Sequence, residues 1–344
     1  MESGAKVLDC SMRDGGYVNN WHFSREQARD CYVAALQTGM NYCEMGFRRT
    51  PVQDPGAFGP WYFASEKLVS ETFSDLVHDS CALAVMAQVG TFSLSDFVPR
   101  ESSLIKMVRL LIAYHCKEKD DSVLDTDVVK ETVQLSAALF ALGYETSINI
   151  GRVDKLSEAQ IEAICGLLAD APIAYLYLAD TYGNLGIHKM QKVLAMFAKY
   201  HKGPLGFHAH DNLQNASVKS IDALYHGASI VDVTFGGFGR GSGNAKAELV
   251  IAHMIMGDHA GYNLLPALTY ADKYVQPYRK SNVLYLITGM YSMHVNYAIA
   301  LIEDDRGLTV RDVYDVLMSI KAEDKHHFFS SDILKQAIAK SSAT

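Results

Sequence analysis

The chain has few of the features that mark secreted, membrane-bound or nucleic-acid-binding proteins. Its six cysteines are scattered and include no CxxC pair, which argues against a disulfide framework and a zinc knuckle. No apolar run approaches membrane-spanning length, and the N-terminus lacks the basic, apolar and small-residue order of a signal peptide. The formal net charge is -8, so neither a nucleic acid nor a membrane is an expected partner. These absences predict a cytoplasmic protein with reduced thiols.

Short β-rich runs alternate with amphipathic helical stretches between residues 6 and 255. The runs cover residues 6–10, 41–47, 82–90, 104–113, 146–151, 173–180, 205–212 and 229–237. One of the intervening helices is bounded by Ser24 and Gln27 as a capping box and by Gly39 as a stop signal. Strands that alternate with helices form parallel βα units, and eight such units predict an α/β fold, the closed (β/α)8 TIM barrel. An open doubly wound sheet is the alternative.

The pattern changes after residue 262. The rest of the chain has mixed helical periodicity, few glycines and no further strand of similar quality. No Pro/Gly/Ser-rich spacer precedes it, which argues against an independent domain on a linker. We therefore expect a TIM-barrel catalytic domain over residues 1–262 and a small C-terminal helical region over residues 263–344, packed on the barrel.

The stretch LGFHAHDN carries His208 and His210 at the end of the seventh run. Alternate residues of a strand point the same way, so two imidazoles face one point. At the end of an inward-facing strand this arrangement suits a divalent metal. Two histidines that merely form hydrogen bonds at a strand end are the alternative.

Two further segments place polar groups at strand ends. Arg13 and Asp14 follow the first run and precede two glycines, which fits a loop with a carboxylate metal ligand beside a guanidinium clamp. A buried ion pair or a helix cap would explain the same residues. The eighth run ends in FGGFGRGSGNAKAE, in which glycines allow close backbone approach and Asn244 can lend a side-chain oxygen to a metal.

Together, RDG, HAHDN and GRGSGNA resemble the DRE-TIM metallolyase superfamily and, within it, the 4-hydroxy-2-oxovalerate aldolase branch. The similarity runs over almost the full length and includes GMYSMHVNYA and LTVRDVYDVL near the C-terminus. It implies that Asp14, His208 and His210 are metal ligands, with Asn244 as a supporting ligand. It also implies that Arg13 is the catalytic arginine and that Tyr291 lines the aldehyde site.

The sequence departs from the aldolase pattern at the catalytic base. The aldolases carry a histidine three residues after the metal-binding aspartate, where this chain has Tyr17. Glu44 resembles the glutamate that the acyl-CoA lyases and Claisen synthases place after strand two. Candidates for the base are therefore Tyr17, His22, Glu44 and a hydroxide on the metal.

The resemblance implies a metal-dependent lyase that cleaves or forms a 4-hydroxy-2-oxo acid through a pyruvate enolate. Mn2+ or Mg2+ is expected in preference to Co2+ or Zn2+. A Claisen-type acyltransferase joining an acyl-CoA to a 2-oxo acid, and a non-catalytic barrel subunit of a larger assembly, are the alternatives. The implied partners are pyruvate, an aldehyde and an acylating aldehyde dehydrogenase, and we expect a homo-oligomer.

Two basic pairs remain. Arg48 and Arg49 follow the second run and are candidates for contact with a substrate carboxylate or phosphate, with surface ion pairing as the alternative. We expect His326 and His327, in the charged segment KAEDKHH, to be solvated.

Overall fold

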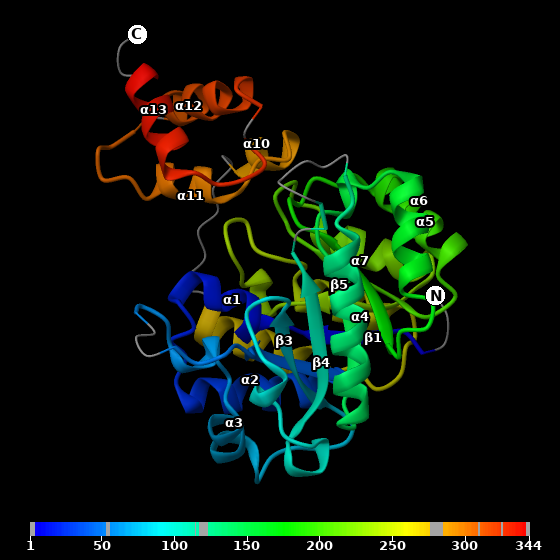
Figure 1. Cartoon of the computed structure of the whole chain (residues 1–344). Helices are drawn as coiled ribbons and strands as arrows, with labels where there is room; N and C mark the ends of the chain where they lie inside the picture. The colour runs from blue at the N-terminus through cyan, green and yellow to red at the C-terminus, as the bar shows by residue number, and fades with distance from the viewer. Residues whose placement is uncertain are drawn as a thin grey trace.

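A computed structural model describes residues 4–52, 56–113, 115–116, 123–275, 285–308, 310–324 and 326–341. Its strands close into a parallel barrel in the order β1 to β8, with β1 paired to β8 (Figure 1). The strands are β1 Lys6–Asp9, β2 Tyr42–Phe47, β3 Ala82–Gln88, β4 Ile105–Ile112, β5 Glu145–Ile150, β6 Tyr175–Asp180, β7 Leu205–Ala209 and β8 Ala228–Val233. All eight runs predicted from the sequence are strands, and the TIM barrel is confirmed.

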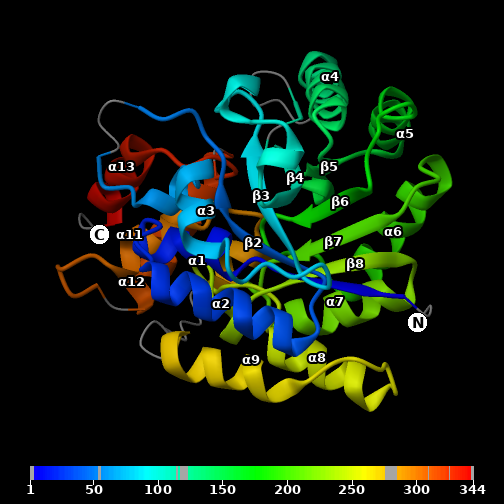
Figure 2. The same ribbon diagram turned by 90° about the horizontal axis from the view of Figure 1, so that it is seen from below.

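Helices surround the strands, as Figure 2 shows for α2 to α8. They are α2 Arg25–Thr38, α3 Glu66–Phe73, α4 Thr126–Ala141, α5 Glu158–Leu167, α6 Ile187–Tyr200, α7 Ala216–Tyr225 and α8 Ala247–Met256. Helix α2 begins and ends as predicted: Ser24 accepts the N–H of Gln27, and Gly39 adopts a left-handed conformation with φ of 89°. Among the described residues, no helix combines the length and the apolar character needed to cross a membrane.

The segment after β1 is a helix, α1 (Ser11–Asn19), and the loop predicted around Arg13 and Asp14 is wrong. Gly15 and Gly16 of this helix allow two aromatic rings to pack closely against its backbone. A Cβ on Gly15 would lie 2.1 Å from the Phe238 ring, and one on Gly16 would lie 2.2 Å from the Trp21 ring. The glycines therefore let α1 sit tightly against its neighbours, and this fixes the Arg13 and Asp14 backbone over the barrel end.

Short 3-10 turns occupy several connections: Pro60–Tyr62, Leu94–Asp96, Arg100–Ser102, Val153–Lys155 and Phe235–Gly237. Helix α9 (Leu264–Tyr270) and the π turn Ala271–Val275 follow α8. Ala267, Tyr270 and Val275 belong to the same hydrophobic core as the barrel strands. The described chain up to residue 275 is thus one packed unit.

The last four helices form a separate hydrophobic cluster. They are α10 Tyr285–Met290, α11 Asn296–Ile302, α12 Val310–Ala322 and α13 Ser331–Ser341. Met293, Tyr297 and Leu317 are at the centre of this cluster, each almost fully buried. In Figure 1 the cluster (orange to red) stands beyond one end of the barrel. Some of its residues line a cavity together with residues of the barrel.

Candidate active site

A cavity of about 210 Å³ lies at the carboxyl ends of the strands, beneath the C-terminal helices. This is the end of a (β/α)8 barrel at which active sites are found. The barrel contributes polar side chains to its lining, and so do the connections between the C-terminal helices. The lining includes Arg13, Asp14, His208, His210, His294 and His327.

Three of the predicted metal ligands line the cavity, and the ligand atoms of two of them, Asp14 and His208, lie within 4.8 Å of each other and of the Cys10 thiol. His208 and His210 extend from the end of β7, with ring centroids 4.9 Å apart. The Nε2 of His208 lies 3.3 Å from Oδ2 of Asp14, which reaches the same point from α1. Burial opposes ionisation of Asp14, but Arg13 and His208 outweigh it and hold the pKa of this carboxyl well below its usual range. Asp14 is therefore a carboxylate at any physiological pH.

Asp232 on β8 orients His208. The Nδ1 of His208 donates to Oδ2 of Asp232 at 2.9 Å, which leaves Nε2 directed toward Asp14. A carboxylate behind an imidazole in this way fixes the ring and its tautomer for metal binding. Burial lowers the pKa of His210 to about 3, so this second imidazole is neutral, as a ligand must be.

Beneath these groups lies a fully buried network of opposite charges. Nε of Arg13 donates to Oε2 of Glu44 at 2.8 Å, and Nη1 of Arg109 lies 3.0 Å from the same oxygen. Arg109 also donates to Asp232 at 2.6 Å, and its guanidinium lies over the Tyr177 ring. Glu44 is thus held between two guanidinium groups below the cavity. We call the following set the floor: Arg13, Asp14, Glu44, Arg109, His208, His210 and Asp232.

The floor residues fit a divalent metal ion. One carboxylate and two imidazoles are a donor set for a transition metal or magnesium ion with open positions for substrate. Asn244 lies beside His210 through an isolated backbone bridge, and its Oδ1 is buried without a hydrogen-bond partner among the described residues. A buried amide oxygen without a partner is costly, and coordination would satisfy it.

Tyr17, one of the predicted candidates for the base, lines the cavity. Its ring packs edge-on against Trp21 at 4.6 Å, and the Arg240 guanidinium lies 5.0 Å from the ring centre. The side chain is 39% exposed because it faces the cleft, yet the surrounding protein raises the pKa of its phenol above the usual value. The phenol therefore keeps its proton at neutral pH.

Several predicted residues lie outside the cavity lining. Arg48 donates to Glu66 at 2.7 Å and to the Asp96 carbonyl, so its guanidinium is engaged elsewhere. Tyr291 packs in the C-terminal cluster, with the Lys321 ammonium 4.3 Å from its ring centre. His22 contacts the Ala57 carbonyl at 2.8 Å.

The C-terminal helices instead bring His294, Val295 and His327 to the cavity. We call these three residues, with Arg240 of the glycine-rich loop, the roof. The expectation that His326 and His327 are solvated is wrong, because His326 is buried and His327 lines the cavity. The charged residues that precede them in KAEDKHH indicate an exposed helix surface. The sequence pattern does not show that the barrel packs against the two histidines.

Sequence reasoning also missed Asp232 and Arg109. Both are charged residues inside otherwise apolar strands, Asp232 in SIVDV and Arg109 in IKMVRLLI. An ion within a strand buried on both faces is a signal in itself, because it is stable only when paired. The partner could not be read from the sequence, since Arg109 and Asp232 are brought together only by barrel closure.

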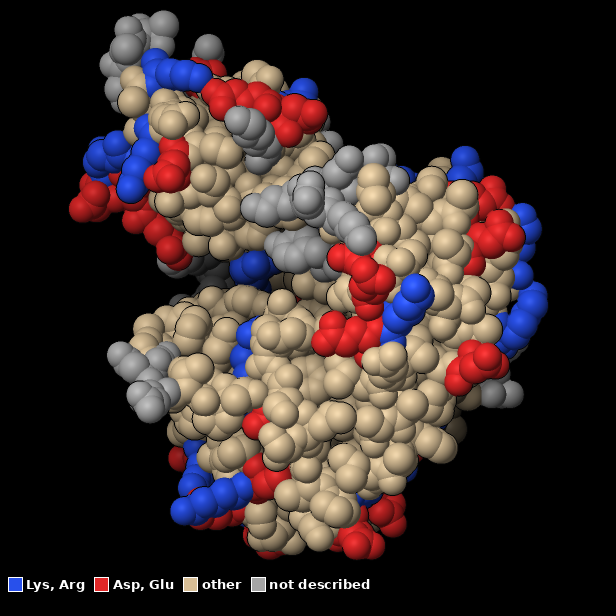
Figure 3. All heavy atoms as spheres, viewed as in Figure 1, with Lys and Arg blue, Asp and Glu red and all other residues tan. Residues whose placement is uncertain are grey.

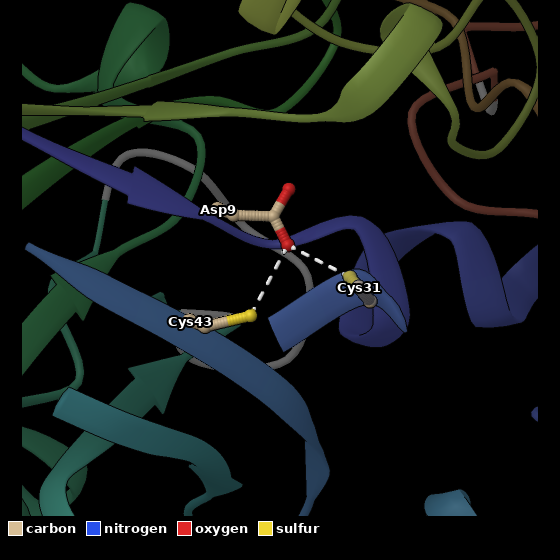
Figure 4. A group of neighbouring side chains, drawn as sticks. All are labelled: Asp9, Cys31 and Cys43. Atoms are coloured by element: carbon tan, nitrogen blue, oxygen red, sulfur yellow. Dashed lines mark hydrogen bonds between the residues drawn. The ribbon is translucent and has the colours of Figure 1, made fainter. Parts of the chain in front are cut away.

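A second cluster of candidate ligands lies behind the barrel wall, away from the cavity lining. Cys31 of α2 and Cys43 of β2 both donate to Oδ2 of Asp9, at 3.4 and 3.5 Å (Figure 4). Burial raises the pKa of Asp9 to about 7 and the pKa of Cys31 to about 11. These thiols stay protonated, and none of the six cysteines, all of which lie in the described residues, forms a disulfide, as predicted.

The HMGL-like family model matches residues 105–269, which span β4 to β8. The chain is thus similar to the HMGL-like family over slightly less than half of its length. The 4-hydroxy-2-oxovalerate aldolase of Geobacillus genomosp. 3 is 26% identical over 302 residues, which cover 85% of each chain. The family resemblance seen in the sequence motifs is thereby confirmed, at the level of a distant relative.

Solved structures show the same fold. The HMG-CoA lyase of Bacillus subtilis superposes with a TM-score of 0.65 at 18% identity, covering 80% of this chain and 94% of its own. The carboxyl transferase domain of Rhizobium etli pyruvate carboxylase reaches a TM-score of 0.69 at 14% identity. It covers 99% of this chain, including the C-terminal helices, and 61% of its own. At these identities the similarity establishes the architecture alone.

Proposed function

We propose that the protein is a divalent-metal-dependent aldolase that cleaves or forms a 4-hydroxy-2-oxo acid through a pyruvate enolate. The observation that carries this proposal is the contact of Asp14 with His208 beside Arg13, with the His210 ring 4.9 Å from that of His208. The names of the sequence relatives support the same reaction class. Breaking the bond between C3 and C4 leaves negative charge on the 2-oxygen, and the site places positive charge there.

Asp14, His208, His210 and Asn244 would hold the metal. When bound, Mn2+ or Mg2+ supplies a Lewis acid that attracts the carboxylate and 2-oxo oxygens and stabilises the enolate. Hard oxygen ligands from the substrate favour these ions, while the two imidazoles also suit softer ones.

Arg13 would stabilise the charge that develops on the 2-oxygen. Its guanidinium is held in place by Glu44 through Nε and by Asp14, 3.3 Å from Nη1. Donors that are fixed before the reaction need no reorganisation when charge appears. Glu44 acts here as a positioning residue, because its carboxylate is occupied by Arg13 and Arg109.

The proton of the 4-hydroxyl group requires an acceptor in the cavity. Tyr17 retains its own proton, so we assign it as a hydrogen-bond donor to the 4-oxygen. The Nδ1 of His327 contacts the Ser292 carbonyl at 2.8 Å and must donate to it, so Nε2 is the ring nitrogen that can accept a proton; this atom lies 3.5 Å from Nζ of Lys155. His327 is therefore our candidate for the base, in the role that the aldolases give to the histidine missing here.

Two solution assays test the proposal. With Mn2+ and pyruvate alone, the protein should exchange the pyruvate methyl protons for deuterium, which proton NMR detects. With 4-hydroxy-2-oxo acids it should release pyruvate, measured with a coupled lactate dehydrogenase. Release of free coenzyme A from an acyl-CoA and a 2-oxo acid, without either aldolase signal, would establish the Claisen acyltransferase instead.

A further inference from the structure

Arg240 lies in the glycine-rich loop where the barrel meets the C-terminal cluster. The following residue, Gly241, has φ of +63°, and a Cβ there would lie 2.6 Å from Val295. Gly243 has φ of +85°, and a Cβ there would lie 2.0 Å from the Gly237 carbonyl oxygen. Only glycine fits either position, so the loop conformation that presents Arg240 is closely fixed.

The Arg240 guanidinium has no carboxylate partner among the described residues, whereas Arg13 and Arg109 each contact two. The Arg240 guanidinium lies over the ring of Tyr17, with its central carbon 5.0 Å from the ring centre. A stacked guanidinium still directs its N–H donors outward in the plane of the group. Arg240 lines the cavity, so these donors are available to a ligand.

The charges of the floor balance without Arg240. The floor holds the carboxylates of Asp14, Glu44 and Asp232 against the guanidinium groups of Arg13 and Arg109. One divalent cation and the carboxylate of one 2-oxo acid therefore bring this layer to neutrality. Among the described residues that line the cavity, Asp14 is the only acid. Arg152, whose guanidinium lies over the Tyr182 and Phe328 rings, also lines the cavity. The charge of Arg240 lies outside the balance of the floor and suits a second anion, and Figure 3 shows basic side chains in the recess between the C-terminal helices and the barrel.

His294 adds a neutral donor beside this charge. Its Nδ1 accepts the N–H of Asn296 at 3.3 Å, so the neutral ring carries its proton on Nε2. Burial and then Arg240 lower the pKa of His294 to about 3, which keeps the ring neutral. An arginine and a neutral imidazole N–H are both donors that suit an anionic oxygen.

From the placement of Arg240 we infer that the aldehyde half of the substrate carries an anionic group, a carboxylate or a phosphate, bound by Arg240 and His294 in the roof. This inference rests on the proposed function for the position of the 2-oxo acid. It predicts a substrate with two anionic ends, one held by the floor and the other by the roof.

Binding of inert ligands tests the inference without any turnover. 2-Oxoglutarate and 2-oxovalerate have the same chain length and the same 2-oxo acid end, but only 2-oxoglutarate carries a second carboxylate at its other end. 2-Oxoadipate and 2-oxohexanoate form the corresponding pair with one more carbon. Calorimetry on the Mn2+-loaded protein should give at least about tenfold tighter binding of the dianion in one of the pairs. Equal affinities within both pairs would overturn the inference.

Arg240→Gln should remove this preference while leaving the affinity for the monoanions unchanged. Arg240→Lys should keep part of it, and Arg25→Gln, an exposed arginine on α2, should keep all of it. A preference that survives Arg240→Gln would contradict the assignment. Because no bond is broken in these experiments, they can succeed or fail whether or not the protein is an aldolase.

Kinetics distinguish the two anions. With pyruvate, kcat/KM for glyoxylate against acetaldehyde reports on a carboxylate, and glyceraldehyde 3-phosphate against glyceraldehyde reports on a phosphate. We expect about 10- to 100-fold preference for one anionic aldehyde, lost in Arg240→Gln. Deuterium exchange into pyruvate with no anionic preference in kinetics or binding would leave the proposed function standing and remove this inference.

Discussion

The floor and the roof of the cavity are built in different ways. Floor carboxylates and guanidinium groups are nearly all fully buried, come from strands or α1, and have their partners within 3.3 Å. Roof side chains come from loops, are partly exposed and have fewer charged partners, as Arg240 and His294 illustrate. Under the proposed function the floor would stabilise the enolate, while the roof would supply the base through His327 and the contacts that select the aldehyde through Arg240 and His294.

The largest expected effect is at the floor. Asp14→Asn removes the only anionic ligand of the metal site, so bound Mn2+ and pyruvate exchange should both fall, exchange by at least about a thousandfold. Elemental analysis and NMR measure the two quantities. The exposed Asp170→Asn variant is the control and should keep both. An Asp14→Asn variant with normal exchange in the presence of a chelator would contradict the metal assignment.

Arg13→Lys sharpens the comparison within the floor, because it keeps the charge but loses the planar group that Glu44 positions. Metal content should be unchanged, and exchange should fall by about 100- to 1,000-fold, as when one preorganised donor to an oxyanion is lost. Glu44→Gln should give a milder loss in the same direction. A normal rate in Arg13→Lys would exclude this arginine from enolate stabilisation.

His327→Ala tests the roof. If His327 accepts the 4-hydroxyl proton, cleavage of 4-hydroxy-2-oxo acids should slow by about 100-fold while metal content stays normal. The exposed His188→Ala variant serves as the control. Should cleavage persist at the parent rate, the base must be sought elsewhere.

Asp232→Asn tests whether this carboxylate positions His208 for metal binding or has only a structural role. We expect the Mn2+ dissociation constant to rise by about 10- to 100-fold, which is typical of removing the partner behind a histidine ligand. A purely structural role would lower the melting temperature without a change in metal affinity. Titration of the apoprotein with Mn2+, alongside thermal unfolding, separates these two outcomes.

Asp9, a carboxyl that lies outside the floor, provides a test on stability alone. Its pKa in the folded protein is raised to about 7, so the unfolded chain loses this proton first as pH increases. The contribution of Asp9 to stability is therefore full below about pH 4 and is lost as pH rises to about 7, on the order of a few kcal/mol. Denaturant unfolding should show this decline in the parent and not in Asp9→Asn.

The sequence predicted the floor better than the roof for a physical reason. Strand periodicity directs His208 and His210 to one side at the end of β7, and barrel closure brings the ends of all strands together, so Asp14 lies beside His208. Tyr291 and His327 depend instead on how a helical cluster docks on the barrel. Helical periodicity describes the interior of that cluster, such as Tyr297 and Leu317, and carries no information about which loops face the cavity.

The central claim is that the floor binds a metal ion together with a 2-oxo acid. A crystal of the protein grown with Mn2+ and oxalate, an analogue of the pyruvate enolate, tests it directly through anomalous scattering at the manganese edge. The account predicts one strong peak at about 2.0 to 2.3 Å from Asp14, His208 and His210, with oxalate chelating the metal beside Arg13. Manganese bound elsewhere, with His208 still held between Asp14 and Asp232, would contradict it.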